Sequence, residues 1–191
     1  DLPRAKKEFK LPTVFSEQEL RKLILSAENI KHKAILCLAY SAGLRISEIV
    51  ALKMVDIDKN RMVITLRAAK GKKDRQVMLS VTLHELLIKY YSEQKEKPKI
   101  WLFEGPKGER YSVRSVGMIM QNAKQRAGIK KKGGIHAIRH SFATHLLESG
   151  TDLMTIKDLL GHTSIQTTGI YTHVSKKQIS KVQSPLDKLG L

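Results

Sequence analysis

Cysteine and long apolar runs are scarce in this chain of 191 residues, and each shortage excludes a class of protein. The one cysteine, Cys37, cannot form an intrachain disulfide, which is typical of proteins in a reducing cytosol. Because residues 34–39 are almost all apolar, we expect Cys37 in a helix core and not as a reactive thiol. No apolar run reaches the roughly 20 residues of a membrane span, and the basic N-terminus lacks the apolar stretch of a signal peptide. The sequence predicts a cytoplasmic protein without a membrane-spanning segment.

Acidic residues are also few. The chain has 18 Asp and Glu against 35 Lys and Arg, which gives a formal net charge of +17. Such an excess indicates a polyanionic partner, for which nucleic acid is the first candidate. The alternatives are a solvated basic surface and a membrane-binding one. Because the charge is spread over many segments and no basic amphipathic helix stands out, we favour nucleic acid.

The hydrophobic pattern predicts a mainly α fold with a small antiparallel β-sheet, an α+β class with one core. We expect residues 1–12 to be a linker from a missing N-terminal portion, 13–183 to form one domain, and 184–191 to be a C-terminal tail. Ser16 and Glu19 form a capping box before the first helix, and Gly43 is suited to end the second. Strands are expected over 62–66 and 76–79, and helices over 17–27, 31–42, 47–52, 82–96, 112–126, 137–148, 153–160, 164–172 and 175–183.

The chemistry is concentrated in the last third of the chain, where Tyr171 is the candidate nucleophile. A phenol can attack phosphorus and keep the bond energy in a phosphotyrosine ester. Its ordinary pKa near 10 means that it needs neighbouring groups to activate it. The alternative is an amphipathic tyrosine that packs at the edge of a helix.

Two arginines make a phosphate site plausible. Arg45 and Arg139 follow apolar residues in segments that look core-facing, where an arginine is costly unless it pairs with an anion. A phosphodiester is such an anion, since two planar guanidinium groups can hold its nonbridging oxygens and stabilise a charge-rich transition state. A salt bridge between Arg45 and Glu48 is the alternative, and Glu48 can orient Arg45 in either case.

Histidines add proton-transfer groups. His136 and His162 can donate hydrogen bonds to a phosphate or move protons near neutral pH. His136 and His140 have the i, i+4 spacing of a helical metal site. Arg139 beside them and the lack of an acidic residue between them argue against a metal.

Basic residues outside this cluster have simpler interpretations. Lys70 lies at the predicted hairpin tip, where it is either an exposed turn lysine or a general acid for a leaving 5′ oxygen. We predict contacts to DNA phosphates for the other basic residues of the hairpin and of the later loop, which are Lys72, Lys73, Arg75, Lys130 and Lys131.

Five motifs in order resemble the tyrosine recombinases of the phage-integrase and Xer type. They are Gly43-Leu44-Arg45-Ile46-Ser47-Glu48, Lys70-Gly71-Lys72-Lys73-Asp74-Arg75, His136-Ala137-Ile138-Arg139-His140, Leu159-Leu160-Gly161-His162 and Tyr171-Thr172-His173. The resemblance implies a catalytic domain of that family, with Tyr171 as the nucleophile and Lys70 as the acid. It implies a phosphate clamp by Arg45 and Arg139, and a hydrogen-bonding and acid/base pair of His136 and His162. We interpret Glu48 and His140 as residues that orient or pack against the catalytic side chains and do not contact the phosphate.

The resemblance also implies strand exchange between two double-stranded DNA sites, through a 3′-phosphotyrosine and a Holliday junction, with no metal or nucleotide cofactor. It implies a homotetramer on DNA and a monomer without DNA. In the tetramer a C-terminal segment of one protomer would dock on the neighbouring protomer. Two alternatives stay open. One is a type IB topoisomerase, and the other is a DNA-binding regulator in which residues 151–173 act as a helix-turn-helix and Tyr171 only packs.

Overall fold

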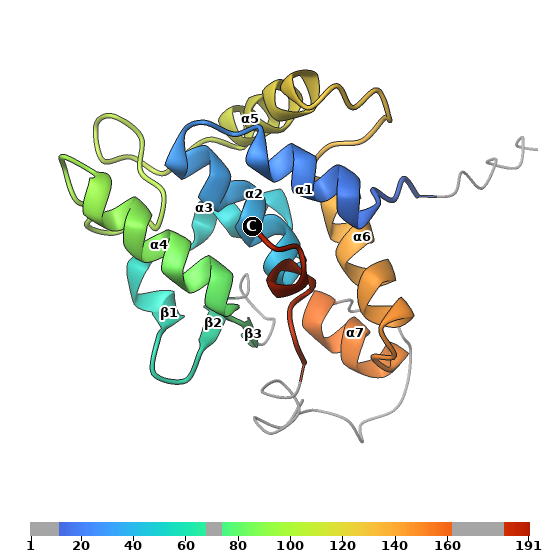
Figure 1. The fold of residues 1–191 in the computed structure, drawn as a ribbon. Coiled ribbons are helices and arrows are strands. Elements are labelled where there is room, and N and C mark those ends of the chain that lie inside the picture. Colours follow the sequence, from blue (N-terminus) through green and yellow to red (C-terminus); the bar gives the residue numbers. More distant parts are fainter. Residues whose placement is uncertain (1–11, 68–73, 162–181) are drawn as a thin grey trace, which may run out of the picture.

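The structure is a computed structural model, and it describes residues 12–67, 74–161 and 182–191 (Figure 1). Within these ranges the chain is mainly helical with one small sheet, as predicted. None of the described helices has the length and apolar character to cross a membrane. In chain order the elements are α1 (Glu17–Leu25), α2 (Ile30–Ala42), α3 (Ile46–Ala51), the 3-10 helix η1 (Met54–Asp56), β1 (Ile57–Asp58), β2 (Val63–Leu66), β3 (Arg75–Met78), α4 (Val81–Glu93), α5 (Val113–Arg126), α6 (Ile135–Glu148), α7 (Leu153–Leu160) and the 3-10 helix η2 (Pro185–Lys188).

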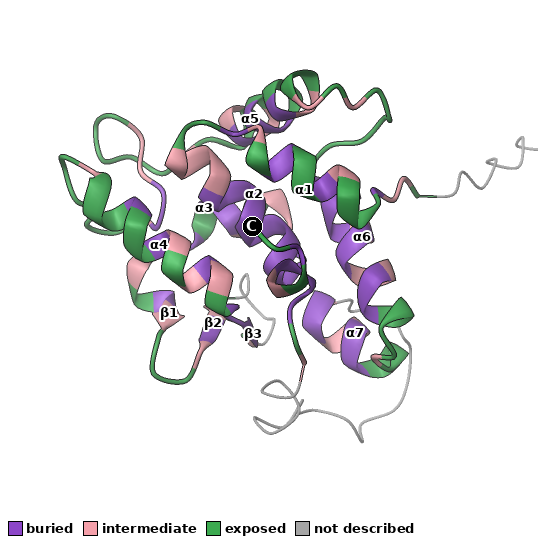
Figure 2. Ribbon diagram, viewed as in Figure 1, coloured by how far each residue is buried: buried purple, intermediate pink, exposed green. Residues whose placement is uncertain are grey.

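Helix α2 forms the centre of the core. Residues 34–42 of this helix are all buried, because its sequence is apolar on every side and needs neighbours on every side. Helices α1, α3, α4, α5 and α6 and the C-terminal η2 all contact it. Figure 2 shows α2 buried along most of its length, whereas α1, α4 and α5 expose their outer faces. Cys37 is fully buried there, as predicted, and burial raises the pKa of its thiol to about 12.

The predicted helix signals are confirmed at several ends. Ser16 and Glu19 form both hydrogen bonds of the capping box of α1. Gly43 ends α2 in the left-handed conformation with φ of 60°. The helix expected over 82–96 already ends at Glu93, where Gln94 turns to an extended backbone.

The sheet is antiparallel with the order β1-β2-β3. The two predicted strands are present as β2 and β3, paired in register from Val63 with Met78 to Leu66 with Arg75. Strand β1 was not predicted, since two residues are too few to show an alternating pattern. The hairpin tip between β2 and β3 lies in residues 68–73, outside the described part of the chain.

The C-terminal segment packs against its own chain. Leu186 of η2 is fully buried against α2 and α4, and the Ser184 hydroxyl donates to the carbonyl of Ser41 at 2.8 Å. The backbone N–H of Thr82, at the start of α4, donates to the carboxylate of Asp187 at 3.0 Å. The helices expected over 164–172 and 175–183 lie outside the described residues except for 182 and 183, which are not helical.

Candidate active site

Arg139 is the most deeply buried charged side chain of the candidate site. It projects from the first half of α6 and is 3% exposed. Its guanidinium donates to the carbonyl of Gly43, at the end of α2, at 2.6 Å and to the carbonyl of Leu160, at the end of α7, at 2.7 Å. Burial, followed by repulsion from Arg45, lowers the pKa of Arg139 to about 10. At neutral pH the group is therefore still a cation, held where two helices end.

Glu48 is the carboxylate at the centre of the site. It accepts a bidentate pair of hydrogen bonds from Arg75 at 2.7 and 3.0 Å and one from the Arg45 side chain at 3.1 Å. The Arg139 guanidinium lies 3.9 Å from it. Burial raises the pKa of Glu48, but the hydrogen bonds from Arg75 and from the Arg45 backbone outweigh burial and hold that pKa below its usual range. One carboxylate thus organises three guanidinium groups, and the cluster keeps a net positive charge.

The same three arginines form hydrogen bonds with the C-terminal end of α7. Three successive carbonyls at its C-terminus each accept from a different guanidinium: Leu159 from Arg75 at 3.0 Å, Leu160 from Arg139 at 2.7 Å, and Gly161 from Arg45 at 3.4 Å. The C-terminal end of a helix carries partial negative charge and unpaired carbonyls, so cations stabilise it.

Local sequence explains why Arg45 is placed here. Gly43 takes a positive φ, and a Cβ on it would lie 2.4 Å from the ring of Phe142, so only glycine lets the chain turn this close to α6. Arg45 then becomes the N-cap of α3. Its backbone N–H donates to Glu48, the third residue of that helix, at 2.8 Å. The helix start therefore fixes the arginine and the carboxylate together, and the ion pair weighed from sequence is present.

The two described histidines of the predicted site lie on the first turns of α6. His136 is exposed, His140 is half-buried, and their rings meet edge to face with centroids 5.5 Å apart. Burial, followed by the charges of His136 and Arg139, lowers the pKa of His140, so this histidine favours the neutral form. Among the residues that the structure describes, no group of three His, Cys, Asp or Glu side chains could hold a metal.

The structure brings the predicted residues Arg45, Glu48 and Arg139 together, and it pairs the rings of His136 and His140 on the helix that carries Arg139. The other predicted catalytic residues, Lys70, His162 and Tyr171, lie outside the described residues, as do Lys72 and Lys73.

The remaining predicted DNA contacts differ in their surroundings. Lys130 is exposed, whereas the ammonium of Lys131 donates to Glu19 at 2.6 Å and to the carbonyl of Val14 at 3.0 Å. Arg75 lies inside the arginine cluster, a placement that sequence reasoning missed. The signal was its position on β3, where it shares one strand face with the buried Val77.

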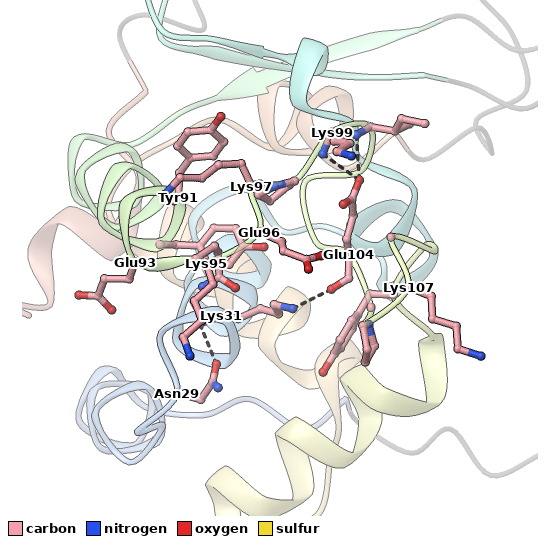
Figure 3. A pocket seen from close by; sticks show the side chains of 18 of the residues that line it. Asn29, Lys31, Tyr91, Glu93, Lys95, Glu96, Lys97, Lys99, Glu104 and Lys107 are labelled. Carbon is pink, nitrogen blue, oxygen red and sulfur yellow. Dashed lines mark hydrogen bonds between the residues drawn. The ribbon is translucent and has the colours of Figure 1, made fainter.

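A separate cleft of about 1380 Å³ lies at the opposite end of α2 (Figure 3). Its walls are the start of α2, the end of α4 and the loops that follow α4. Some of its lysine side chains form hydrogen bonds with the backbone of the cleft walls. Lys31 donates to the carbonyl of Glu104 at 2.7 Å, and Lys97 donates to the carbonyl of Tyr91 at 2.7 Å. Its lining includes neither Arg45 nor Arg139, so it is not part of the candidate site.

Comparison with known proteins identifies the family. Residues 13–178 match the model of the phage integrase family, over more than half of the chain. The chain belongs to the phage integrase family. The tyrosine-recombinase resemblance of its motifs is thereby confirmed, and the fold is that of the family's catalytic domain.

The chain spans 61% and 59% of the length of two relatives that it matches. A putative integrase/recombinase of Sinorhizobium fredii is 42% identical over 189 residues, which is 98% of this chain and 61% of that protein. Tyrosine recombinase XerA of Pyrococcus horikoshii is 36% identical over 171 residues, which is 88% of this chain and 59% of XerA. The crystal structure of the XerH site-specific recombinase bound to difH substrate, a pre-cleavage complex, matches with a TM-score of 0.69 and 28% identity over 81% of this chain and 48% of that one.

Proposed function

We propose that this domain is the catalytic part of a site-specific DNA recombinase that cleaves and rejoins DNA through a 3′-phosphotyrosine. The observation that carries the proposal is the cluster of Arg45, Arg75 and Arg139 around the single carboxylate of Glu48. Its excess positive charge, at a site where two helices end, suits a phosphodiester whose charge grows in the transition state. Membership of the phage integrase family supports the same interpretation.

In the proposed reaction the Tyr171 phenol gives its proton to the acid/base pair of His136 and His162, its oxygen attacks the scissile phosphorus, and the bond from phosphorus to the 5′ oxygen breaks. Lys70 gives a proton to the leaving 5′ oxygen, which departs as a hydroxyl. Arg45 and Arg139 bind the nonbridging oxygens, and His136 with His162 completes the hydrogen-bonding and acid/base set. A 5′ hydroxyl of the partner duplex then attacks the phosphotyrosine, so each ester bond is replaced by another and no cofactor is consumed.

The proposed partner is double-stranded DNA with paired recombination sites. The net charge of +17 supports it, as does the difH substrate that the similar recombinase XerH binds in its crystal structure. We extend the proposal to four protomers around a Holliday junction, a monomer without DNA, and a domain over 13–183 between a linker at 1–12 and a tail at 184–191. Transfer of that tail to a neighbouring protomer would first break its contacts to Ser41 and Thr82 of its own chain.

A nicked suicide duplex tests the proposal. The probe carries the inverted repeats that flank the coding region, and the protein used is the full-length recombinase. We expect an adduct that resists SDS and that Tyr171→Phe abolishes. A DNA-binding regulator would shift the duplex without forming the adduct, and a type IB topoisomerase would relax supercoiled DNA without recombining two sites. Either result contradicts the proposed recombination.

Arg139→Ala separates catalysis from binding. We expect cleavage to slow by roughly 10² or more, the scale for loss of one transition-state donor, while DNA affinity falls much less. Because Arg139 also joins the ends of α2 and α7, circular dichroism must first show that the variant is folded. Arg126→Ala is the matched control, since this arginine is half-exposed and pairs with the exposed Glu28 at 3.7 Å. Equal losses of cleavage and affinity would make Arg139 a simple anchor.

A further inference from the structure

We infer that Arg75 is a positioning residue of the proposed active site and not a contact to DNA. It holds Glu48 and the C-terminal end of α7, and through them it sets the places of Arg45 and Arg139. The inference rests on the proposed function for its catalytic consequence, but its structural core can be tested without DNA.

Three of the five N–H groups of the Arg75 guanidinium donate to protein atoms. Its two terminal nitrogens donate to the two carboxylate oxygens of Glu48 at 2.7 and 3.0 Å, and its Nε donates to the carbonyl of Leu159 at 3.0 Å. The side chain is 20% exposed. Two parallel bonds from a planar fork fix the direction of a carboxylate as well as its distance, which a single bond does not. Each of the three nitrogens therefore already serves the protein.

Gly161 provides the space for this arrangement. A Cβ on Gly161 would lie 2.8 Å from a terminal nitrogen of Arg75 and 2.9 Å from its Cζ. Gly161 also has a left-handed φ of 63° that favours glycine. The absence of a side chain lets the guanidinium of Arg75 lie against the backbone immediately before His162.

Glu48 transmits the effect to the other arginines. Its carboxylate binds the side chain and the backbone N–H of Arg45 and lies 3.9 Å from Arg139. Without Arg75, this carboxylate loses its two-pronged partner and is free to move toward the remaining guanidinium groups. At the same time the Leu159 carbonyl loses its donor. Both shifts displace groups that we propose to hold the scissile phosphate, and a misplacement of about 1 Å can cost 10²-fold in rate.

Substitution of Arg75 by lysine and by alanine distinguishes a positioning role from a contact to a DNA phosphate. A phosphate contact needs a positive charge, which lysine keeps, whereas the bonds to Glu48 and Leu159 need the planar fork. Arg75→Lys should therefore behave like Arg75→Ala if Arg75 positions the site, and like the native protein if it binds DNA. Arg67→Ala is a matched control, because Arg67 directly follows Leu66, which pairs with Arg75 in the sheet, but its side chain pairs with Asp56 at 2.7 Å.

The first arm of the experiment uses the DNA-free protein. Hydrogen exchange is measured by mass spectrometry on peptides from α7 (Leu153–Leu160) and from α5. We expect Arg75→Ala and Arg75→Lys to speed hydrogen exchange in α7 by about tenfold or more, because both variants lose several buried hydrogen bonds. The exchange rate in α5 should not change. Arg67→Ala should leave both helices unchanged. Unaltered exchange in α7 for both Arg75 variants would overturn the inference whether or not the protein cleaves DNA.

The second arm uses the suicide duplex and the full-length protein. At saturating DNA we expect single-turnover cleavage to slow about 10-fold to 10²-fold in both Arg75 variants, with the affinity for DNA not weakened and its salt dependence unchanged. Glu48→Ala combined with Arg75→Ala should be no slower than Glu48→Ala alone, because the two residues act as a unit. A contact to DNA predicts instead that Arg75→Ala weakens binding, lowers the salt slope by about 0.9, and is rescued by lysine. If the native protein forms no adduct, the proposed function fails, and the first arm still decides the place of Arg75.

Discussion

At the scale of single residues, Glu48 is the side chain on which the site depends. Its pKa is held low in the folded protein, so it binds fewer protons there than in the unfolded chain, whose Glu pKa is about 4.3. The carboxylate therefore stabilises the fold above that unfolded pKa. The stabilisation is lost as pH falls through the lower, folded pKa.

This sign gives a prediction for Glu48→Gln. At pH 7 the variant should unfold at lower urea concentration than the native protein, because the charge-assisted bonds to Arg75 and Arg45 are weakened. The difference should shrink steadily below about pH 4, where the native carboxylate also takes up a proton. Urea unfolding of both proteins from neutral to strongly acidic pH measures it. A difference that does not change with pH would show that the charge of Glu48 contributes nothing.

Much of the site at this scale could be predicted from sequence. Apolar neighbours correctly indicated that Arg139 is buried, and the ion pair of Arg45 with Glu48, which the sequence left open as an alternative, is present. The role of Arg75 could not be predicted from its own motif, because that motif is basic throughout and resembles a DNA-binding hairpin. What sets Arg75 apart is its contact with residues 48 and 159, which lie far away in the chain.

At the scale of elements, the turn from α2 to α3 is the most constrained. Gly43→Ala must place a methyl group 2.4 Å from the Phe142 ring and keep a positive φ. The backbone strain costs about 1–2 kcal/mol and the overpacking about 1–3 kcal/mol. We expect a loss of stability of at least about 2 kcal/mol, measured by chemical unfolding.

Gly117→Ala is the matched control for this prediction. Gly117 lies inside α5, and an added Cβ would meet nothing within 4 Å. Alanine favours a helix over glycine by up to about 1 kcal/mol, so this variant should be neutral or more stable. If Gly43→Ala matched it, the turn would be more adaptable than its contacts indicate.

The helices themselves were predictable from capping residues and apolar spacing, and their ends differ from prediction by a few residues. Strand β1 was not, because its two residues are defined by pairing with β2 and not by any local pattern. Helix η2 could not be predicted either, because its position depends on its contacts with α2 and α4.

At the scale of the whole molecule, the C-terminal segment closes the core. Leu186→Ala removes a fully buried side chain, which typically costs about 2–5 kcal/mol, and deletion of residues 184–191 should cost at least as much. Thermal unfolding measures both, and Lys188→Ala, at an exposed position of the same segment, is the control. An unchanged Tm after deletion would mean that this segment does not stay docked on its own chain in solution.

The arrangement at the end of α7 links two equilibria. Arg45 and Arg139, which we propose to bind a phosphate, also donate to the carbonyls of Gly161 and Leu160 at the end of that helix. An anion that draws them outward competes with those carbonyls, so its binding and the closing of the helix end share one coupling free energy. Such coupling is reciprocal. Phosphate binding therefore loosens the end of α7 by the same factor by which closing that end weakens phosphate binding, so a change that loosens this end raises the affinity for phosphate even where it touches no DNA.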